Sequence, residues 1–148
     1  MKRSMAIEPV RLFIDTWGWL ALADANDPVH QRAVQVRRSH VGRGSLVTTD
    51  YILDETITRL FSRCPFLQAQ AFCEHVFEAR ALGIISIEAI TPDRFDSAWK
   101  LRARYRDKPQ ISFTDLTSFV VMRELGLRQV LTADSHFAKV HLGFRILP

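Results

Sequence analysis

Two kinds of hydrophobic pattern alternate along this chain. Short apolar runs are typical of buried strands, and longer stretches in which apolar residues recur every three or four positions are typical of amphipathic helices. The short runs predict strands at 10–14, 45–48, 84–87, 130–131 and 144–147. The longer stretches predict helices at 17–24, 27–41, 49–64, 66–82, 91–108 and 112–125, most of them ended by glycine or proline.

This alternation of strands and helices predicts an α/β fold class. We expect a three-layer α/β/α sandwich around a mainly parallel, twisted sheet, whose crossover connections are right-handed. No internal repeat or low-complexity linker interrupts the 148 residues, so we expect a single domain over 1–148. Residues 1–8 precede the first strand, and we expect them to be poorly ordered.

Acidic residues follow two of the predicted strands. Asp15 ends the first strand, and Asp134 comes just after the strand at 130–131. Ligands of open parallel sheets bind at the carboxyl ends of the strands, so both side chains should face the same rim. Glu55 lies about two turns into the helix after the second strand, and Asp115 lies in the first turn of a later helix. Either can point to that rim as well.

Four carboxylates in one pocket would need a neutralising partner. Each like-charge pair about 5 Å apart costs about 3 kcal/mol at an effective dielectric constant of 20. Six such pairs would approach the whole stability of a small domain, about 5–15 kcal/mol. Protons or a divalent cation can remove this repulsion, and an all-oxygen site favours Mg²⁺ or Mn²⁺ over zinc. Such a site suits hydrolysis of phosphodiester bonds.

Each acid also has a simpler structural interpretation when taken alone. Asp15 fits the capping position of the helix that follows it. Asp54 and Glu55 fit a solvated helix face, where adjacent residues point about 100° apart so that only one can face the pocket. Asp115 fits a helix N-terminus, and Asp134 fits a turn.

Composition narrows the class of protein without naming a reaction. A 47% hydrophobic and 24% charged chain is typical of a soluble globular protein. The net charge of +4 eases contact with a polyanion such as RNA. Cys64 and Cys73 have neither zinc-finger spacing nor a disulfide-rich context. The sequence shows neither a clear signal peptide nor a membrane-spanning stretch, so we expect a cytoplasmic protein without a membrane partner.

Other catalytic chemistries find little support. No serine lies in a GxSxG turn, and no glycine-rich phosphate loop occurs. A phosphatase of the haloacid-dehalogenase type needs an acid two residues after Asp15, where this chain has Trp17. The histidines suggest no catalytic arrangement, and we expect His136 to be peripheral; they are His30, His40, His75, His136 and His141.

Several segments in order resemble the PIN-domain family, particularly the VapC-type toxins of toxin-antitoxin pairs. They are LFIDT (12–16), TDYILDE (49–55), ISFTDLTSF (111–119), LTADSHF (131–137) and the terminal GFRILP (143–148). Together they place the resemblance over nearly the full length from Val10 onward.

The resemblance implies a role for each acid. Asp15 and Asp115 become the principal ligands of Mg²⁺ or Mn²⁺, Asp134 a further ligand, and Glu55, at the motif position next to Asp54, the organiser of a metal-bound water. Donors around these ligands would be Thr16, Ser112 and Thr114.

The resemblance also implies a function and partners. We expect an endoribonuclease that acts on RNA, forms a homodimer and is inhibited by a small antitoxin protein as the toxin of a type II toxin-antitoxin pair. A housekeeping PIN nuclease in RNA processing and a non-catalytic module that binds RNA or a protein partner remain alternatives. The RNA target, the number of metal ions and the antitoxin are not encoded in any readable pattern.

Overall fold

The computed structural model describes residues 10–148. It contains a five-stranded parallel sheet in the order β3-β2-β1-β4-β5. The strands are β1 (Leu12–Ile14), β2 (Leu46–Thr49), β3 (Ile85–Glu88), β4 (Gln129–Leu131) and β5 (Arg145–Leu147). The helices are α1 (Thr16–Ala23), α2 (His30–Arg38), α3 (Asp50–Arg63), α4 (Phe66–Ala81), α5 (Pro92–Arg104), α6 (Phe113–Glu124) and α7 (His136–Lys139).

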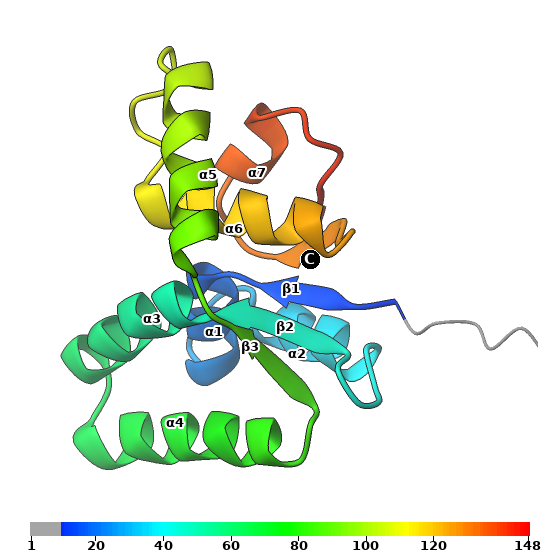
Figure 1. Cartoon of the computed structure of the whole chain (residues 1–148). Coiled ribbons are helices and arrows are strands. Elements are labelled where there is room, and N and C mark those ends of the chain that lie inside the picture. Colours follow the sequence, from blue (N-terminus) through cyan, green and yellow to red (C-terminus); the bar gives the residue numbers. More distant parts are fainter. Residues whose placement is uncertain (1–9) are drawn as a thin grey trace, which may run out of the picture.

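The helices form a layer on each side of the sheet (Figure 1). Helices α5, α6 and α7 lie on one side, and α1, α2 and α4 lie on the other, with α3 packed beside α1. The α/β sandwich expected from the alternation of strands and helices is therefore confirmed. The expectation of disorder in residues 1–8 falls outside the described residues.

Strand β1 occupies the centre of the sheet because it is apolar on both faces. Leu12, Phe13 and Ile14 are all fully buried, as expected for a strand covered by helices on each side. The chain adds β2 and β3 on one side of β1 and then returns to place β4 on the other side. The carboxyl ends of β1 and β4 therefore flank the point where strand order reverses, which is where ligands bind in open parallel sheets.

The contact between α1 and β4 depends on one glycine. A Cβ atom added to Gly18 would collide with the backbone carbonyl of Leu131. Because Gly18 has no side chain, α1 lies directly against the end of β4. Because of this close approach, the segment that begins at Asp15 and the segment that follows Leu131 lie at the same rim of the sheet.

Helix α2 is shorter than the sequence pattern predicts. The pattern places Pro28 in the first helical turn, but α2 begins at His30. The Asp27 carboxylate instead accepts a hydrogen bond from the backbone N–H of Val29 at 2.9 Å and forms a turn. At the other end, the side chains of Ser39 and His40 both contact the Val36 carbonyl at 2.7 Å and end the helix.

Helix α7 was not predicted from the sequence. It has only four residues, too few to give a hydrophobic period, and it forms because Phe137 is fully buried. The Phe137 ring packs edge-on against Phe119 of α6, with ring centroids 5.0 Å apart. This aromatic contact holds α7, and with it the neighbouring His136, beside α6. None of the helices in the range 10–148 is both long enough and apolar enough to cross a membrane.

Candidate metal centre

Asp15 lies at the end of β1 in a nearly closed environment. Asp15 is only 2% exposed, and its Oδ2 accepts a hydrogen bond of 2.8 Å from the Thr132 hydroxyl. Asp15 occupies the N-cap position of α1, as the simpler interpretation expects, but its side chain makes no capping hydrogen bond. Burial, followed by repulsion from Asp115, raises the pKa of Asp15 to about 7. The Thr132 hydroxyl opposes this change by stabilising the carboxylate.

Asp115 lies in the first turn of α6 and has two structural roles at once. Its backbone N–H donates to the Ser112 hydroxyl at 3.0 Å, and its Oδ2 accepts from the backbone N–H of Ser112 at 3.4 Å. This reciprocal capping box fixes the start of the helix. The same carboxylate is buried at the rim, where desolvation and then repulsion from Asp134 raise its pKa. Helix capping thus fixes the residue without removing it from the site.

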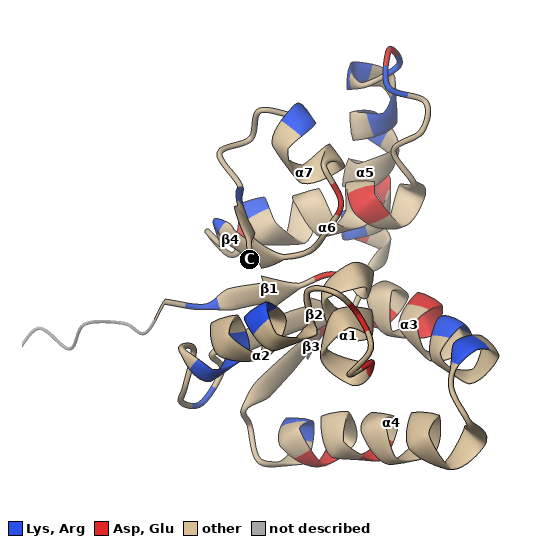
Figure 2. Ribbon diagram, turned by 180° about the vertical axis from the view of Figure 1, so that it is seen from behind, with Lys and Arg blue, Asp and Glu red and all other residues tan. Residues whose placement is uncertain are grey.

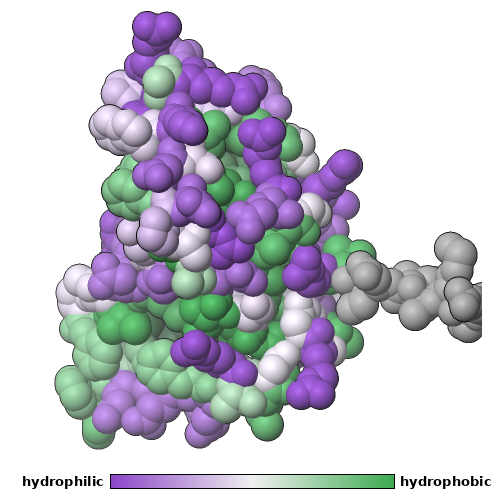
Figure 3. Space-filling view, viewed as in Figure 1, coloured by the Kyte–Doolittle hydropathy of each residue, from purple (hydrophilic) through white to green (hydrophobic). Residues whose placement is uncertain are grey.

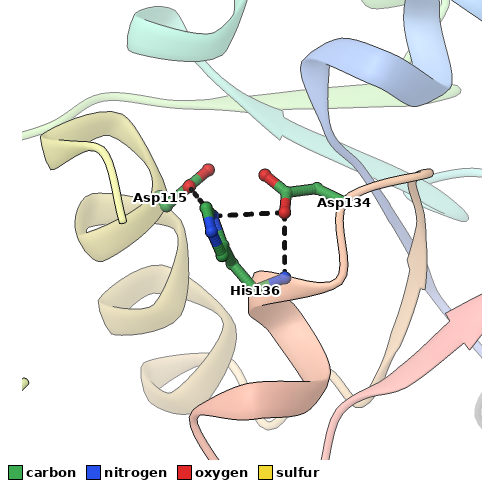
Figure 4. A group of neighbouring side chains, drawn as sticks. All are labelled: Asp115, Asp134 and His136. Carbon is green, nitrogen blue, oxygen red and sulfur yellow. Dashed lines mark hydrogen bonds and ion pairs between the residues drawn. The ribbon is translucent and has the colours of Figure 1, made fainter. Parts of the chain in front are cut away.

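Asp134 follows β4 and faces His136 (Figure 4). Its Oδ1 accepts a hydrogen bond of 2.8 Å from the His136 backbone N–H. The His136 ring Nδ1 lies 3.2 Å from this Oδ1 and 3.3 Å from Oδ2 of Asp115. The imidazole is therefore placed between two carboxylates from different elements. The expectation that His136 is peripheral is wrong.

These groups form a compact set of metal-binding atoms. One ligand atom each from Asp115, Asp134 and His136 lies within 4.8 Å of the other two. Asp15 interacts electrostatically with this set, because the charges of Asp115 and Asp134 both raise its pKa. Buried, mutually repelling carboxylates are stabilised by a cation, and their oxygen atoms are ligands that hard divalent ions prefer. The residues present therefore fit a divalent metal ion.

Glu55 lies at the edge of this centre rather than among the three aspartates. Its Oε2 accepts a hydrogen bond of 3.1 Å from the Thr16 hydroxyl, and its Oε1 contacts Arg59 at 3.0–3.1 Å. The neighbouring Asp54 is exposed. Of the two adjacent acids, it is Glu55 that faces the Asp15–Thr16 segment.

The three predicted supporting donors occupy different positions. Thr16 is buried and donates to Glu55, and Ser112 forms the capping box with Asp115. The Thr114 carbonyl accepts hydrogen bonds from the hydroxyls of Thr117 and Ser118. Within residues 10–148, the Thr114 hydroxyl makes no hydrogen bond to any of the four acids.

Comparison with known proteins agrees with this architecture. A family model described as the PIN domain matches residues 12–142. This chain belongs to the PIN-domain family. The resemblance noted in the sequence is thereby confirmed.

One relative and two solved structures make the comparison more specific. Over 127 residues this PIN domain is 32% identical to the 23S rRNA-specific endonuclease VapC20 of Mycobacterium tuberculosis, covering 86% of this chain and 92% of the relative. The crystal structure of that protein, described as a sarcin-ricin loop cleaving toxin, superimposes with a TM-score of 0.75 at 31% identity over 88% of this chain and 95% of the other. PAE2754 from Pyrobaculum aerophilum matches with a TM-score of 0.63 at 16% identity, over 93% and 89% of the two chains, which supports the fold alone.

Two residues of this PIN-domain site were missed by sequence reasoning. Thr132 donates to Asp15 and also accepts a hydrogen bond of 2.9 Å from the Asp134 backbone N–H. Its only sequence signal is its place two residues before Asp134, directly after a buried strand. The signal for His136 is similar, since it lies two residues after Asp134. Both residues lie close to a site acid in the sequence, but β4 and α7 determine where their side chains point.

Proposed function

We propose that this chain is a metal-dependent endoribonuclease that hydrolyses RNA phosphodiester bonds as a single nuclease domain over residues 1–148. The observation that carries the proposal is the convergence of Asp15, Asp115 and Asp134 at one rim, where burial and mutual repulsion raise the pKa values of Asp15 and Asp115. The 32% identity to an rRNA-specific endonuclease over most of both chains supports the reaction class.

The three aspartates would hold the metal ion. When bound, a divalent ion lowers the pKa of a coordinated water and stabilises the negative charge that develops on the phosphoryl group. The hydrogen bond from the Thr132 hydroxyl orients the Asp15 carboxylate, and the capping box with Ser112 orients the Asp115 carboxylate. His136 contacts both Asp115 and Asp134, so it orients the two carboxylates relative to each other.

Glu55 would accept a proton from, or orient, the attacking water at the edge of the centre. Thr16 holds one of its oxygens and Arg59 the other, so the carboxylate direction is fixed by two contacts. Arg59 and Glu55 are both partly exposed, so their ion pair adds little to stability, and its main effect is orientation.

Mg²⁺ and Mn²⁺ remain the proposed ions. Carboxylate oxygens suit both, whereas the imidazole of His136 is a poorer partner for Mg²⁺ than for softer transition ions. If His136 only orients the aspartates, Mg²⁺ and Mn²⁺ should support cleavage similarly. If it contacts the ion, Mn²⁺ should be preferred, and His136→Asn should remove that preference.

We further propose the role of a cytoplasmic toxin in a type II toxin-antitoxin pair, with a small antitoxin protein as its inhibitor and a homodimer as its assembled form. Apolar side chains on α4 support a protein contact: Phe66 and Leu67 are 64% and 76% exposed. Hydrophobic residues also gather over α3 and α4 on the face shown in Figure 3. Exposed apolar surface of this kind is typical of interaction sites. Light scattering of the purified protein tests the dimer.

The decisive experiment is RNA cleavage with a matched pair of variants. A stem-loop carrying the sarcin-ricin sequence of 23S rRNA is the first substrate to test, because the relative cleaves it. Asp115→Asn should lower cleavage by about 1,000-fold or more, since it removes a ligand charge. Asp93→Asn alters another aspartate in the first turn of a helix, α5, and should leave cleavage unchanged. Cleavage that survives chelation of metal, or that survives Asp115→Asn, would contradict the proposal.

A further inference from the structure

An aromatic and cationic cluster adjoins the candidate metal centre. Trp17 follows Thr16 in α1, and the residue is 37% exposed. The guanidinium carbons of Arg59 and Arg63, one turn apart on α3, lie 5.2 Å and 5.5 Å from the centre of this ring. Both distances are within the range of cation–π contact. Two arginine side chains therefore lie over one partly exposed indole ring.

This cluster is continuous with the centre through side-chain contacts. Arg59 is hydrogen-bonded to Glu55, and Glu55 is hydrogen-bonded to Thr16. Thr16 lies between Asp15 and Trp17 in the sequence. Helices α1 and α3 pack side by side along this line. In Figure 2, basic residues colour the end of α3 that points away from the sheet. An RNA strand leaving the metal centre on this side would meet the cluster first.

The charges of the two arginines are not equivalent. Arg59 is paired with Glu55, but within residues 10–148 no carboxylate forms an ion pair with Arg63. A free guanidinium attracts phosphate, and an exposed indole offers a face for a nucleobase. The aspartates of the centre repel a polyanion until metal binds, so a cationic neighbour would be needed to hold the strand.

We propose that Trp17, Arg59 and Arg63 form a subsite for a nucleotide of single-stranded RNA next to the bond that is cleaved. Trp17 stacks on the base, Arg63 pairs with a phosphate, and Arg59 holds the indole while remaining bonded to Glu55. This inference rests on the ribonuclease function proposed above. It differs from that function in assigning substrate recognition to residues outside the acidic centre.

The test measures binding and its salt dependence separately. A fluorescein-labelled oligoadenylate is titrated with protein in the presence of Ca²⁺, and anisotropy gives the Kd at several salt concentrations. Trp17→Ala should raise the Kd about tenfold or more without changing the salt slope, because stacking involves no counterion release. Arg63→Gln should reduce the slope of log Kd against log salt by about 0.7, the value for one phosphate contact on a single strand.

Three further variants control for folding and for unspecific charge effects. Trp17→Phe keeps an aromatic ring and should keep most of the affinity, whereas Arg63→Lys keeps the charge and should restore the salt slope. Arg38→Gln removes an exposed arginine at the end of α2, near the amino ends of the strands, and should change neither quantity. Thermal melting shows that each variant is folded.

The outcomes separate this inference from the proposed function. Wild-type cleavage of RNA combined with unchanged Kd and salt slope in Trp17→Ala and Arg63→Gln would overturn the subsite alone. If these variants bind RNA like wild type but change the oligomeric state, the cluster belongs to a protein contact, and the subsite is again overturned. Loss of binding in these variants, with Arg38→Gln unaffected, supports the subsite even if wild-type protein fails to cleave the tested RNA.

Discussion

The Thr132 hydroxyl donates a hydrogen bond of 2.8 Å to the Asp15 carboxylate across the boundary between β4 and β1. The same hydroxyl oxygen accepts from the Asp134 backbone N–H at 2.9 Å. Thr132 is buried, so neither contact can be replaced by bulk water. One side chain therefore sets the relative positions of two proposed metal ligands.

Replacing Thr132 by valine should weaken metal binding. The substitution preserves shape but leaves the Asp15 carboxylate and the Asp134 N–H without this partner, and loss of such supporting contacts typically costs about 10- to 100-fold in metal affinity. Thr132→Ser keeps the hydroxyl and should stay close to wild type. Calorimetric titration with Mn²⁺ measures the difference. Equal affinity in the valine and serine variants would show that the hydroxyl does not support the site.

The pKa of Asp15 predicts how stability depends on pH in metal-free protein. The pKa of about 7 in the folded state lies above the ordinary aspartate pKa of 3.8, so the folded state binds more protons than the unfolded state between these limits. The free energy of unfolding should therefore fall as pH rises from about 4 to about 7, by up to about 4 kcal/mol from this residue. Asp115, whose pKa is also raised, contributes in the same direction.

Asp15→Asn should remove this part of the pH dependence. At pH 8 in a chelator, the variant should be more stable than wild type, because it no longer buries a charge, although we expect it to be inactive. Denaturant unfolding at several pH values measures both curves. Added Mn²⁺ should stabilise wild type more than the variant. Parallel pH curves for the two proteins would show that Asp15 is not the group responsible.

Glu55 and Asp54 provide a matched pair that tests the water-organising role proposed for Glu55. Glu55→Gln retains an oxygen for the Thr16 hydroxyl but loses the negative charge, so it should lower kcat by about 100-fold or more with little change in KM. Asp54→Asn, at the exposed neighbouring position, should stay within about twofold of wild type. Steady-state cleavage measures both. An equal loss in the two variants would point to a general effect of charge on α3.

Arg102 should stabilise the loop that leads into α6. Its guanidinium donates to the backbone carbonyls of Tyr105, Lys108 and Ile111 at 2.6–2.7 Å. Arg102→Met should lower the free energy of unfolding by at least about 2 kcal/mol, because it leaves several partly buried acceptors unpaired. It should also weaken metal binding, since the loop ends at Ser112 and Asp115.

Arg104→Met is the matched control for this prediction. Arg104 lies two residues further along α5 and is exposed; its guanidinium carbon lies 5.6 Å from the centre of the Tyr105 ring, and its guanidinium makes no hydrogen bond with other residues of the range 10–148. The control should change stability by less than about 0.5 kcal/mol. A similar loss in the two variants would indicate that charge on α5, and not the three carbonyl contacts, stabilises the loop.

By itself, the sequence determined the α/β class, the order of the elements and the acidic residues of the candidate site. These are local properties: Leu12–Ile14 is apolar enough to be a central strand, and proline or glycine follows the ends of α3, α4 and α6. The motif position also favoured Glu55 over Asp54, in agreement with the contact to Thr16. The short helix α7 escaped prediction because four residues carry no period.

Only the tertiary structure decided which of these residues meet. Asp15 and Thr132 are 117 positions apart, and their contact exists because β4 pairs with β1 and Gly18 lets α1 lie against β4. The burial of Phe137 brought His136 between two aspartates, and Glu55 came to lie beside Thr16 rather than among them. Hydrophobic periodicity specifies which face of an element is buried, whereas distances between elements depend on how the packed layers fit together.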